Sequence, residues 1–269
     1  MATLDILICT IDDRVQRVPF LLLPPQEGVR YVVSMQCTEE RSFSLVPDVL
    51  RRRADVEVLM LRGRGLARNR NHALAHATAD AALIADDDMA YTLPRLHRLQ
   101  QCLHDNPQAQ VALFEAVDRE GRLMKRYPTQ STDYRAAMTC RGYYPSSWEM
   151  VLRREAFSHL RFDERFGIGS GVFPCGEEEV LLHDAVQQGL DVRFFPIVIG
   201  ETDRATTGSR FLTDPDVQRA KGAVFAYTHG RHHALCLCLK EALHHLIFSH
   251  ANPLTTFRHM REGARCLGK

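Results

Sequence analysis

The sequence of 269 residues has an ordinary globular composition, with 45% hydrophobic residues. Because 34 Lys and Arg residues balance 33 Asp and Glu residues, no overall basic field draws the chain to nucleic acid or to an anionic membrane. The length suits one large domain, alone or with an appended segment. The sequence contains no run of about 18 or more uncharged apolar residues, so no transmembrane helix is predicted.

Short apolar runs alternate with helical patterns along most of the chain. In chain order, strands are predicted at 4–10, 29–35 and 56–61, a helix at 68–78, a strand at 81–85, a helix at 93–106, a strand at 111–117, irregular connections with one or two edge strands at 121–147, a strand at 148–152, a helix at 155–160, a glycine-rich loop at 167–171, a helix at 177–189 and a strand at 192–199. This alternation is typical of an α/β fold with a mostly parallel central sheet flanked by helices. In such a fold, ligands lie at the carboxyl ends of the strands.

The last forty residues or so have a helical pattern. We predict a globular domain at 1–228 and a helical C-terminal tail at 229–269. Its most apolar stretch, 234–249, is interrupted by Lys240, Glu241 and two histidines. Two interpretations stay open: a helix packed on the core, which we favour, and a peripheral membrane contact.

The eight cysteines do not suggest a disulfide framework. The N-terminus has neither the basic region nor the long apolar run of a signal peptide. Cys236 and Cys238 lie two residues apart, which is the wrong spacing for a zinc site. We therefore predict reduced, mostly buried thiols in a cytoplasmic protein.

Three adjacent carboxylates, Asp86, Asp87 and Asp88, follow directly after the strand predicted at 81–85. Like charges at the end of a buried strand repel one another and resist desolvation. A divalent cation removes this conflict, and Mg²⁺ or Mn²⁺ takes one or two carboxylates together with phosphate and water. The alternative is a solvated turn or a helix cap, but the position at a strand end favours a ligand site.

A second segment, Gly65-Leu66-Ala67-Arg68-Asn69-Arg70-Asn71, stands about a dozen residues before the aspartates. Its content and spacing resemble glycosyltransferase family 2, whose members carry Gly-Leu-Ser/Ala-x-x-Arg-Asn before a strand-ending Asp-x-Asp motif. The resemblance implies a GT-A (nucleotide-diphospho-sugar transferase) fold, an inverting mechanism and a UDP-, GDP- or dTDP-sugar donor.

The same resemblance implies roles for the residues of these motifs. Asp86 would face the ribose or base, Asp88 would ligate the metal that bridges the diphosphate, and Asp87 would assist either role. We therefore take Asp88 and Asp86 as candidate metal ligands and Asp86 and Asp87 as candidate donor-binding residues. Arg70 would lie near the donor, with a helix-face salt bridge as the equal alternative.

A third segment contains Phe162-Asp163-Glu164-Arg165-Phe166, a glycine-rich loop and Gly176-Glu177-Glu178-Glu179. It resembles the family's Phe-Asp-Glu-x-Phe and Gly-Glu-Asp, and the resemblance makes Glu178 the general base, with Glu177 and then Glu179 as lesser candidates. An inverting transfer needs a carboxylate to take the proton of the acceptor hydroxyl. Acidic residues also suit a helix N-terminus, but this does not explain the preceding motif.

The nucleotide-binding positions match the family only in part. Thr10 and Arg14 fit its Pro-Thr-Tyr-Asn-Arg motif after the first strand and are candidate donor-binding residues, whereas Cys9 and Ile11 depart from it. Ser34 stands where the family has an aspartate that reads the base, so the base stays open.

The stretch from Glu201 to Ser209 resembles a loop of a bacterial branch of the family that acts in surface-polysaccharide assembly. The histidine of that loop is replaced here by Glu201 or a neighbour. Glu201 and Asp203 are candidate substitutes in a metal or phosphate site. Hydroxyl donors to phosphate are predicted at Thr206, Thr207 and Ser209.

The sequence thus predicts an inverting, hexosyltransferase-like enzyme that moves a sugar from a nucleotide-diphosphate donor to a glycan or lipid-linked acceptor. It would use Mn²⁺ or Mg²⁺ and act in the cytoplasm, or peripherally on the inner membrane face, without a nucleic-acid partner. Two alternatives stay open. One is a metal-dependent nucleotidyltransferase or phosphoesterase, and the other is a non-catalytic nucleotide-sugar-binding member of the fold, which the departures at Ser34 and Glu201 suggest.

Overall fold

The computed structural model describes residues 2–203, 210–249 and 252–267. They form two compact units. The first comprises the described residues of Met1–Arg64, Arg68–Arg161 and Asp184–Arg204, and the second those of Gly65–Ala67, Phe162–His183 and Ala205–Lys269. The domain boundary at residue 228 stays a prediction.

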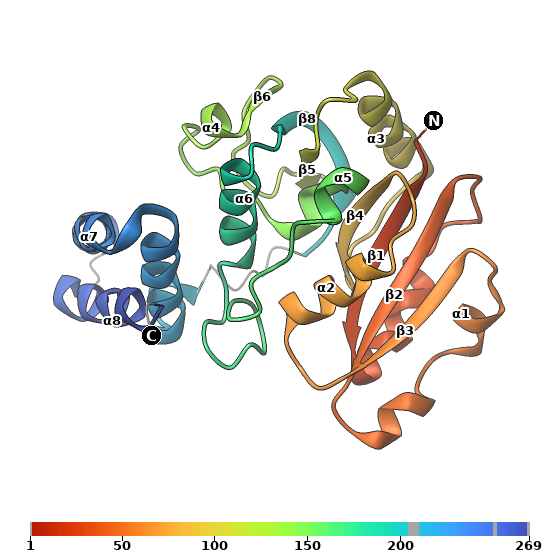
Figure 1. Ribbon diagram of the computed structural model, residues 1–269, viewed down its shortest axis with the longest axis horizontal. Helices are drawn as coiled ribbons and strands as arrows, with labels where there is room; N and C mark the ends of the chain where they lie inside the picture. Colours follow the sequence, from red (N-terminus) through yellow and green to blue (C-terminus); the bar gives the residue numbers. More distant parts are fainter. Residues whose placement is uncertain (1, 204–209, 250–251, 268–269) are drawn as a thin grey trace. The chain divides into compact units, whose positions relative to one another are not determined.

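The first unit is built on a sheet that has eight strands within the described residues, in the order β3-β2-β1-β4-β7-β5-β8-β6 (Figure 1). Their bounds are β1 Leu4–Ile11, β2 Val29–Cys37, β3 Val56–Arg62, β4 Ala81–Asp86, β5 Val111–Val117, β6 Thr132–Asp133, β7 Met150–Arg153 and β8 Val192–Glu201. The pairs β1–β2, β2–β3, β1–β4 and β5–β8 are parallel, whereas β7 and β6 pair antiparallel to their neighbours. The mostly parallel sheet flanked by helices is therefore confirmed.

The helices are more numerous than the sequence pattern indicated. They are η1 Asp12–Phe20, η2 Glu40–Ser44, α1 Asp48–Arg52, α2 Leu66–Ala75, α3 Leu93–Asp105, α4 Tyr134–Ala137, η3 Ser147–Glu149, α5 Arg154–Phe157, α6 Glu177–Gln187, α7 Pro215–Ser249 and α8 Pro253–Cys266. Helix α3 has Pro94 in its first turn, where a missing N–H costs nothing. It buries Leu96, Leu99 and Leu103 along one face.

The core of the first unit explains the uninterrupted apolar runs in the sequence. Strand β1 is buried from Leu4 to Thr10, as expected for a parallel strand that is covered on both faces. Ile6 of this strand, Leu99 of α3 and Phe114 of β5 belong to one hydrophobic cluster. The sheet and its covering helix thus hold the carboxyl ends of the strands in fixed positions.

The segment before β7 differs from the prediction. We expected a strand at 148–152, but residues 147–149 form the 3-10 helix η3 and β7 begins only at Met150. Ser146 and Glu149 close a capping box around η3, because each side chain accepts from the other residue's backbone N–H. This local bonding competes with the strand pairing that the apolar pattern favoured.

Strand β8 is irregular in its middle. Phe194 pairs with Leu113, but the next partners are Val198 and Glu115, so β8 carries extra residues around Pro196. Proline has no N–H to donate to the ladder, and it is tolerated at such a bulge. Beyond the bulge, β8 ends at Glu201, whose backbone exchanges two hydrogen bonds with Ala90 at 2.8 and 2.9 Å. The chain just after the three aspartates is therefore fixed to the end of β8.

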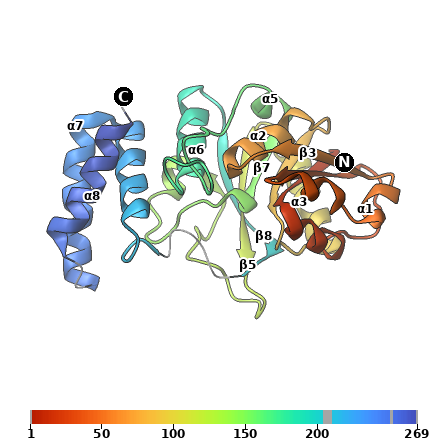
Figure 2. The ribbon, with the colours of Figure 1, turned by 90° about the horizontal axis from the view of Figure 1, so that it is seen from below.

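In the second unit, α7 and α8 pack side by side (Figure 2). Glycines permit the close approach: a Cβ on Gly222 of α7 would lie 1.9 Å from the carbonyl oxygen of Met260, and one on Gly263 of α8 would lie 1.8 Å from that of Arg219. Gly230 has a φ of 75° and interrupts α7. Among the described helices, none is long and apolar enough to cross a membrane.

All eight cysteines are free thiols. Cys9, Cys37, Cys102 and Cys238 are buried, but Cys236 and Cys266 are exposed. The prediction of mostly buried thiols therefore fails at these two positions, which lie on the solvent-facing sides of α7 and α8.

Candidate functional site

The candidate site begins where β1 and β4 end. These strands are parallel and neighbouring, with Cys9 opposite Asp86, so the residues that follow them meet at one edge of the sheet. The Thr10 hydroxyl donates to Asp87 across this edge at 2.7 Å. Asp87 is 3% exposed, so this carboxylate is buried between the two strand ends.

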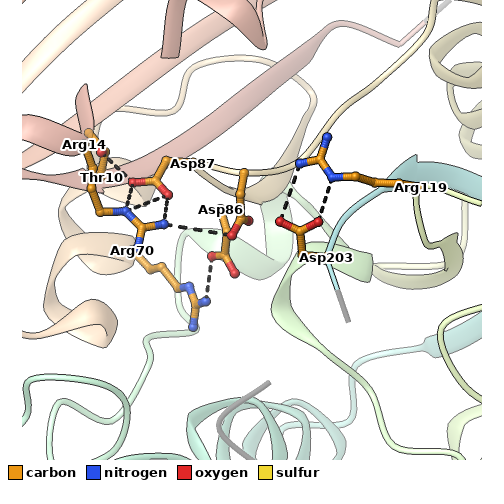
Figure 3. Close-up of polar contacts among 8 residues, drawn as sticks. Thr10, Arg14, Arg70, Asp86, Asp87, Arg119 and Asp203 are labelled. Atoms are coloured by element: carbon orange, nitrogen blue, oxygen red, sulfur yellow. Dashed lines mark hydrogen bonds and ion pairs between the residues drawn. The ribbon is translucent and has the colours of Figure 1, made fainter. Parts of the chain in front are cut away.

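Arg14 neutralises the buried Asp87 (Figure 3). Its Nε lies 3.0 and 2.8 Å from the two carboxylate oxygens, and its Nη2 forms a further contact with Oδ1. The hydrogen bond to Asp87 raises the pKa of Arg14. Such a forked contact fixes both side chains. Asp87 therefore joins η1 to the end of β4.

Asp86 has a different cation as its partner. Arg70 of α2 donates from Nη2 to Asp86 Oδ1 at 3.0 Å, and the same Nη2 donates to Ser147 Oγ at 2.6 Å. Arg70 is only 1% exposed. The structure thus brings Arg70 to the aspartates, rather than to an exposed salt bridge on the helix face.

Asp88 has the least compensation of the three aspartates. Its side chain is 36% exposed, and the salt bridge given by Arg14 spans 3.9 Å. Burial and the neighbouring carboxylates Asp86 and Asp87 raise the pKa of Asp88. Burial and the two like charges thus disfavour the ionised form of Asp88, and a bound cation would stabilise that form.

The donor set at Asp88 fits a hard divalent cation. No group of three or more His, Cys, Asp and Glu side chains that could hold a metal exists among the described residues. Mg²⁺ and Mn²⁺ are commonly held by only one or two protein carboxylates, together with substrate phosphates. Asp88 with Asp86 beside it could provide those carboxylates.

A polar cluster connects the ends of β1 and β2. Asn69 donates from Nδ2 to the carbonyl oxygens of Thr10 and Ser34 at 3.1 and 3.0 Å. The Ser34 hydroxyl lies 2.7 Å from Asn69 Oδ1 and 2.9 Å from His72 Nδ1. Burial, His76 and Arg68 lower the pKa of His72. Ser34, the departure from the family pattern, is therefore part of a buried hydrogen-bond network.

The end of β8 contributes further charges. Arg119 Nε lies 2.6 Å from Asp203 Oδ1 on the exposed surface, and this bond lowers the pKa of Asp203 (Figure 3). Arg95 lies 3.9 Å from Glu201. Glu201 and Asp203, the candidate substitutes for the histidine of the bacterial branch, thus both have arginine partners. The predicted hydroxyl donors Thr206, Thr207 and Ser209 lie outside the described residues.

The glutamates of the third motif begin α6. Gly176 before them has a φ of 102°, and a Cβ there would lie 2.5 Å from Val224 Cγ2. Gly167 lies against Glu177, since a Cβ at Gly167 would be 3.1 Å from the carboxyl carbon of that residue. Both positions have a positive φ, 98° at Gly167 and 102° at Gly176, which favours glycine, and at Gly176 a side chain would also clash with Val224.

The three glutamates differ in their surroundings. Glu177 is 4% exposed, whereas Glu179 forms an ion pair with Lys221 at 2.7 Å. Burial alone would lower the pKa of Lys221, but the charge of Glu179 more than offsets this and raises it. Glu179 thus has a structural partner in Lys221.

Residues 42–162 match the model of the family described as glycosyl transferase family 2. Over this stretch, which is less than half of the chain, the sequence is similar to glycosyltransferase family 2. The matched range contains the Arg-Asn segment and all three aspartates. Among curated proteins, no sequence matches this glycosyltransferase significantly.

The glycosyltransferase is also similar to crystal structures of S. aureus TarS. TarS 1–349 has a TM-score of 0.62 at 13% identity, over 99% of this chain and 92% of that one. Its complex with UDP-GlcNAc gives 0.60 at 12% over the same shares, and its complex with UDP gives 0.58 at 14% over 92% and 72%. At such identities the likeness shows the fold alone, and that fold is GT-A.

The first unit thus brings together most of the residues predicted from the sequence: Thr10, Arg14, Arg70, Asp86, Asp87 and Asp88. Glu177 and Glu178 belong to the second unit. Sequence reasoning missed Ser147, which contacts Arg70, and the structural role of Asn69. The sequence does contain a signal for the turn at Ser147, because Ser146 and Glu149 have the Ser-x-x-Glu spacing of a capping box.

Proposed function

We propose that this glycosyltransferase moves a sugar, with inversion, from a nucleoside-diphosphate donor to a hydroxyl group of a glycan or lipid-linked acceptor. The observation that carries the proposal is the unequal pairing of the three aspartates. Among the described residues, Asp87 is bonded to Thr10 and Arg14, Asp86 is bonded to Arg70, and Asp88 has only a 3.9 Å salt bridge with Arg14.

Each part of the donor would meet a matching group at this edge. Asp88, assisted by Asp86, would hold Mn²⁺ or Mg²⁺, and the bound cation would neutralise the charge of the leaving diphosphate. Asp86 and Asp87, with Thr10 and Arg14, would form the wall of the nucleoside pocket. UDP is our first choice of nucleotide, because TarS has been crystallised with UDP and UDP-GlcNAc.

Glu178 is the proposed general base. The acceptor oxygen attacks the anomeric carbon while the bond from that carbon to the diphosphate oxygen breaks, and Glu178 takes the hydroxyl proton. The resemblance of the motif to the family's Gly-Glu-Asp supports Glu178 over its neighbours. Glu177, which is largely buried, is the second candidate.

Nucleotide binding gives the first test. The thermal stability of the protein is measured with UDP, GDP, CDP or dTDP, each with and without Mn²⁺. We expect one nucleotide to raise the Tm only with Mn²⁺, since ligands that bind the native state stabilise it by mass action. Asp88→Asn should abolish the Mn²⁺ dependence, whereas the exposed control Asp48→Asn should retain it. Equal Mn²⁺ dependence in both variants would show that the metal assignment is wrong.

Product analysis separates the proposal from its alternatives. With a panel of nucleotide sugars and acceptors, a glycosyltransferase releases the free nucleoside diphosphate. Release of a sugar phosphate would indicate a nucleotidyltransferase or phosphoesterase instead. Binding without turnover, unchanged in Glu178→Gln, would indicate the non-catalytic member of the fold.

We also propose that α7 rests on the inner face of an anionic membrane. Leu235, Leu239, Leu243 and Leu246 are 40–50% exposed, with helical spacing along one face. The sequence from 229 onward is basic, with Arg231, Lys240, Arg258, Arg261, Arg265 and Lys269 against Glu241 and Glu262. An apolar stripe on a basic helix pair is typical of interfacial binding, and it suits a lipid-linked acceptor.

Vesicle sedimentation tests this contact. Vesicles with phosphatidylglycerol should retain the protein at low salt, and pure phosphatidylcholine vesicles should retain less of it. Leu239→Glu together with Leu243→Glu should release it, while the control Leu212→Glu, on an exposed leucine before α7, should not. Vesicle binding that is unchanged in the double variant would contradict a membrane role.

A further inference from the structure

The short helix η3 is fixed by a buried carboxylate. Glu149 is fully buried, and its Oε2 accepts from the backbone N–H of Ser146 at 3.1 Å. Tyr127 donates its hydroxyl proton to the same carboxylate. Tyr127 itself stacks on Phe194 of β8, with ring centroids 6.1 Å apart. Glu149 thus ties η3 to the sheet.

Lys125 is the counter-charge of this carboxylate. Its side chain is 4% exposed, and its Nζ lies 3.0 Å from Glu149 Oε1. The same Nζ donates to Ser146 Oγ and to the Tyr144 carbonyl oxygen, both at 2.7 Å. One ammonium group therefore holds both residues that cap η3.

A buried ion pair of this kind is poor evidence of a stabilising role. Removing two charges from water costs several kcal/mol per ion, and apolar replacements are commonly as stable. Specific geometry is the better-supported use of such a pair. The residue that this geometry places is Ser147, in the middle of the capped turn.

Ser147 is the link between η3 and the three aspartates. It is 1% exposed, and its Oγ accepts from Arg70 Nη2 at 2.6 Å. The same Nη2 lies 3.0 Å from Asp86 Oδ1. Arg70 has several rotatable bonds and is costly to order, so a second fixed acceptor limits where its guanidinium can point.

We infer that Ser147 is a positioning residue for the donor site. The Lys125–Glu149 pair holds Ser147, and Ser147 in turn aims Arg70 at Asp86. Ser147 touches neither donor nor metal in this scheme and acts only through Arg70. The expected effect on donor binding rests on the proposed function, whereas the coupling between Ser147 and Arg70 does not. In this way Lys125 and Glu149 act on Asp86 through Ser147 and Arg70.

A double-mutant cycle tests the inference. Ser147→Ala, Arg70→Gln and the double variant are compared by titration with UDP at saturating Mn²⁺, and by the Tm of the ligand-free protein. We expect Ser147→Ala to weaken UDP binding about tenfold in the parent and less than about twofold in Arg70→Gln. We also expect Ser147→Ala to lower the Tm of the ligand-free parent but not the Tm of Arg70→Gln.

Two further variants sharpen the result. Ser44→Ala removes an exposed hydroxyl that donates to the Arg41 carbonyl at 2.8 Å, and it should change neither readout. Lys125→Met with Glu149→Gln replaces the ion pair by uncharged residues of similar size. We expect it to weaken UDP binding several-fold while the Tm falls little or rises, a combination that a purely stabilising pair would not give.

The outcomes are distinct. Equal losses from Ser147→Ala with and without Arg70 would overturn the inference, and so would no loss in the parent. If the parent itself does not bind UDP with Mn²⁺, the proposed nucleotide is wrong. The Tm cycle then still decides whether Ser147 acts through Arg70.

Discussion

The three aspartates should respond differently to the same substitution, although they are adjacent and chemically identical. Asp87→Asn removes the charge that Arg14 and Thr10 bind. Hydrogen bonds to charged groups contribute about 1.5–3 kcal/mol each when buried, but Arg14 is 44% exposed and its share is screened by solvent. We therefore expect a loss of about 1–2 kcal/mol, which for a domain of this size lowers the Tm by about 2–8 °C.

Asp88→Asn should behave in the opposite way. Its carboxylate is partly exposed and lies beside two like charges, with Arg14 at 3.9 Å. Its loss should change the free energy of unfolding by less than about 0.5 kcal/mol. The ligand-induced shift should vanish instead: nucleotide at 100 times its Kd stabilises the parent by about 2.7 kcal/mol.

Differential scanning fluorimetry measures both effects on the same samples, in EDTA and in Mn²⁺ with nucleotide. Asp87→Asn should have the lower ligand-free Tm and keep a Mn²⁺-dependent shift. Asp88→Asn should keep the Tm and lose the shift. If Asp88→Asn is the less stable of the two in EDTA, the assignment of roles from burial and pairing is refuted.

The remaining predictions concern both units. Glu178→Gln should lower kcat by at least about a hundredfold with UDP affinity unchanged, whereas Glu179→Gln should lower the Tm and leave kcat within a few-fold, as steady-state kinetics and fluorimetry would reveal. Asp5 is buried and accepts from Arg30 and two backbone N–H groups, which lower its pKa although burial opposes this. Its contribution is therefore present above the ordinary carboxyl range and lost as pH falls through the lowered pKa, so the stability deficit of Asp5→Asn at pH 7 should shrink below about pH 4 in urea titrations. Gly222→Ala should separate α7 from α8 because a Cβ would meet the Met260 backbone, and proteolysis between the helices should accelerate; unchanged cleavage would argue against that close packing.

Much of the first unit could be predicted because its signals are local. The apolar runs before Thr10 and Asp86 mark buried parallel strands, and parallel strands end at a common edge, so the meeting of Thr10, Arg14 and Asp87 follows from pattern and topology together. The pattern could not show which aspartate is buried. That depends on the register of β1 against β4 and on where η1 places Arg14.

Other features were missed for reasons that are also physical. Lys125 and Glu149 are ordinary charged residues in sequence, and only burial turns them into a pair that fixes η3. Residues 148–152 look like a strand because their side chains are buried, yet a capping box overrides that preference for the first turn. Ser147 has no motif of its own, since its importance comes entirely from the placement of Arg70.

The contact of Thr10 and Arg14 with Asp87 joins segments more than seventy residues apart, across the seam between β1 and β4. In the proposed function, the nucleotide pocket forms only when both strands are in place. A chain in which β1 and β4 have not yet paired should therefore fail to bind its donor, even if its local helices have formed. Stoichiometric nucleotide binding would thus count the molecules that have completed this long-range closure, and it would serve as a folding assay for variants far from any catalytic group.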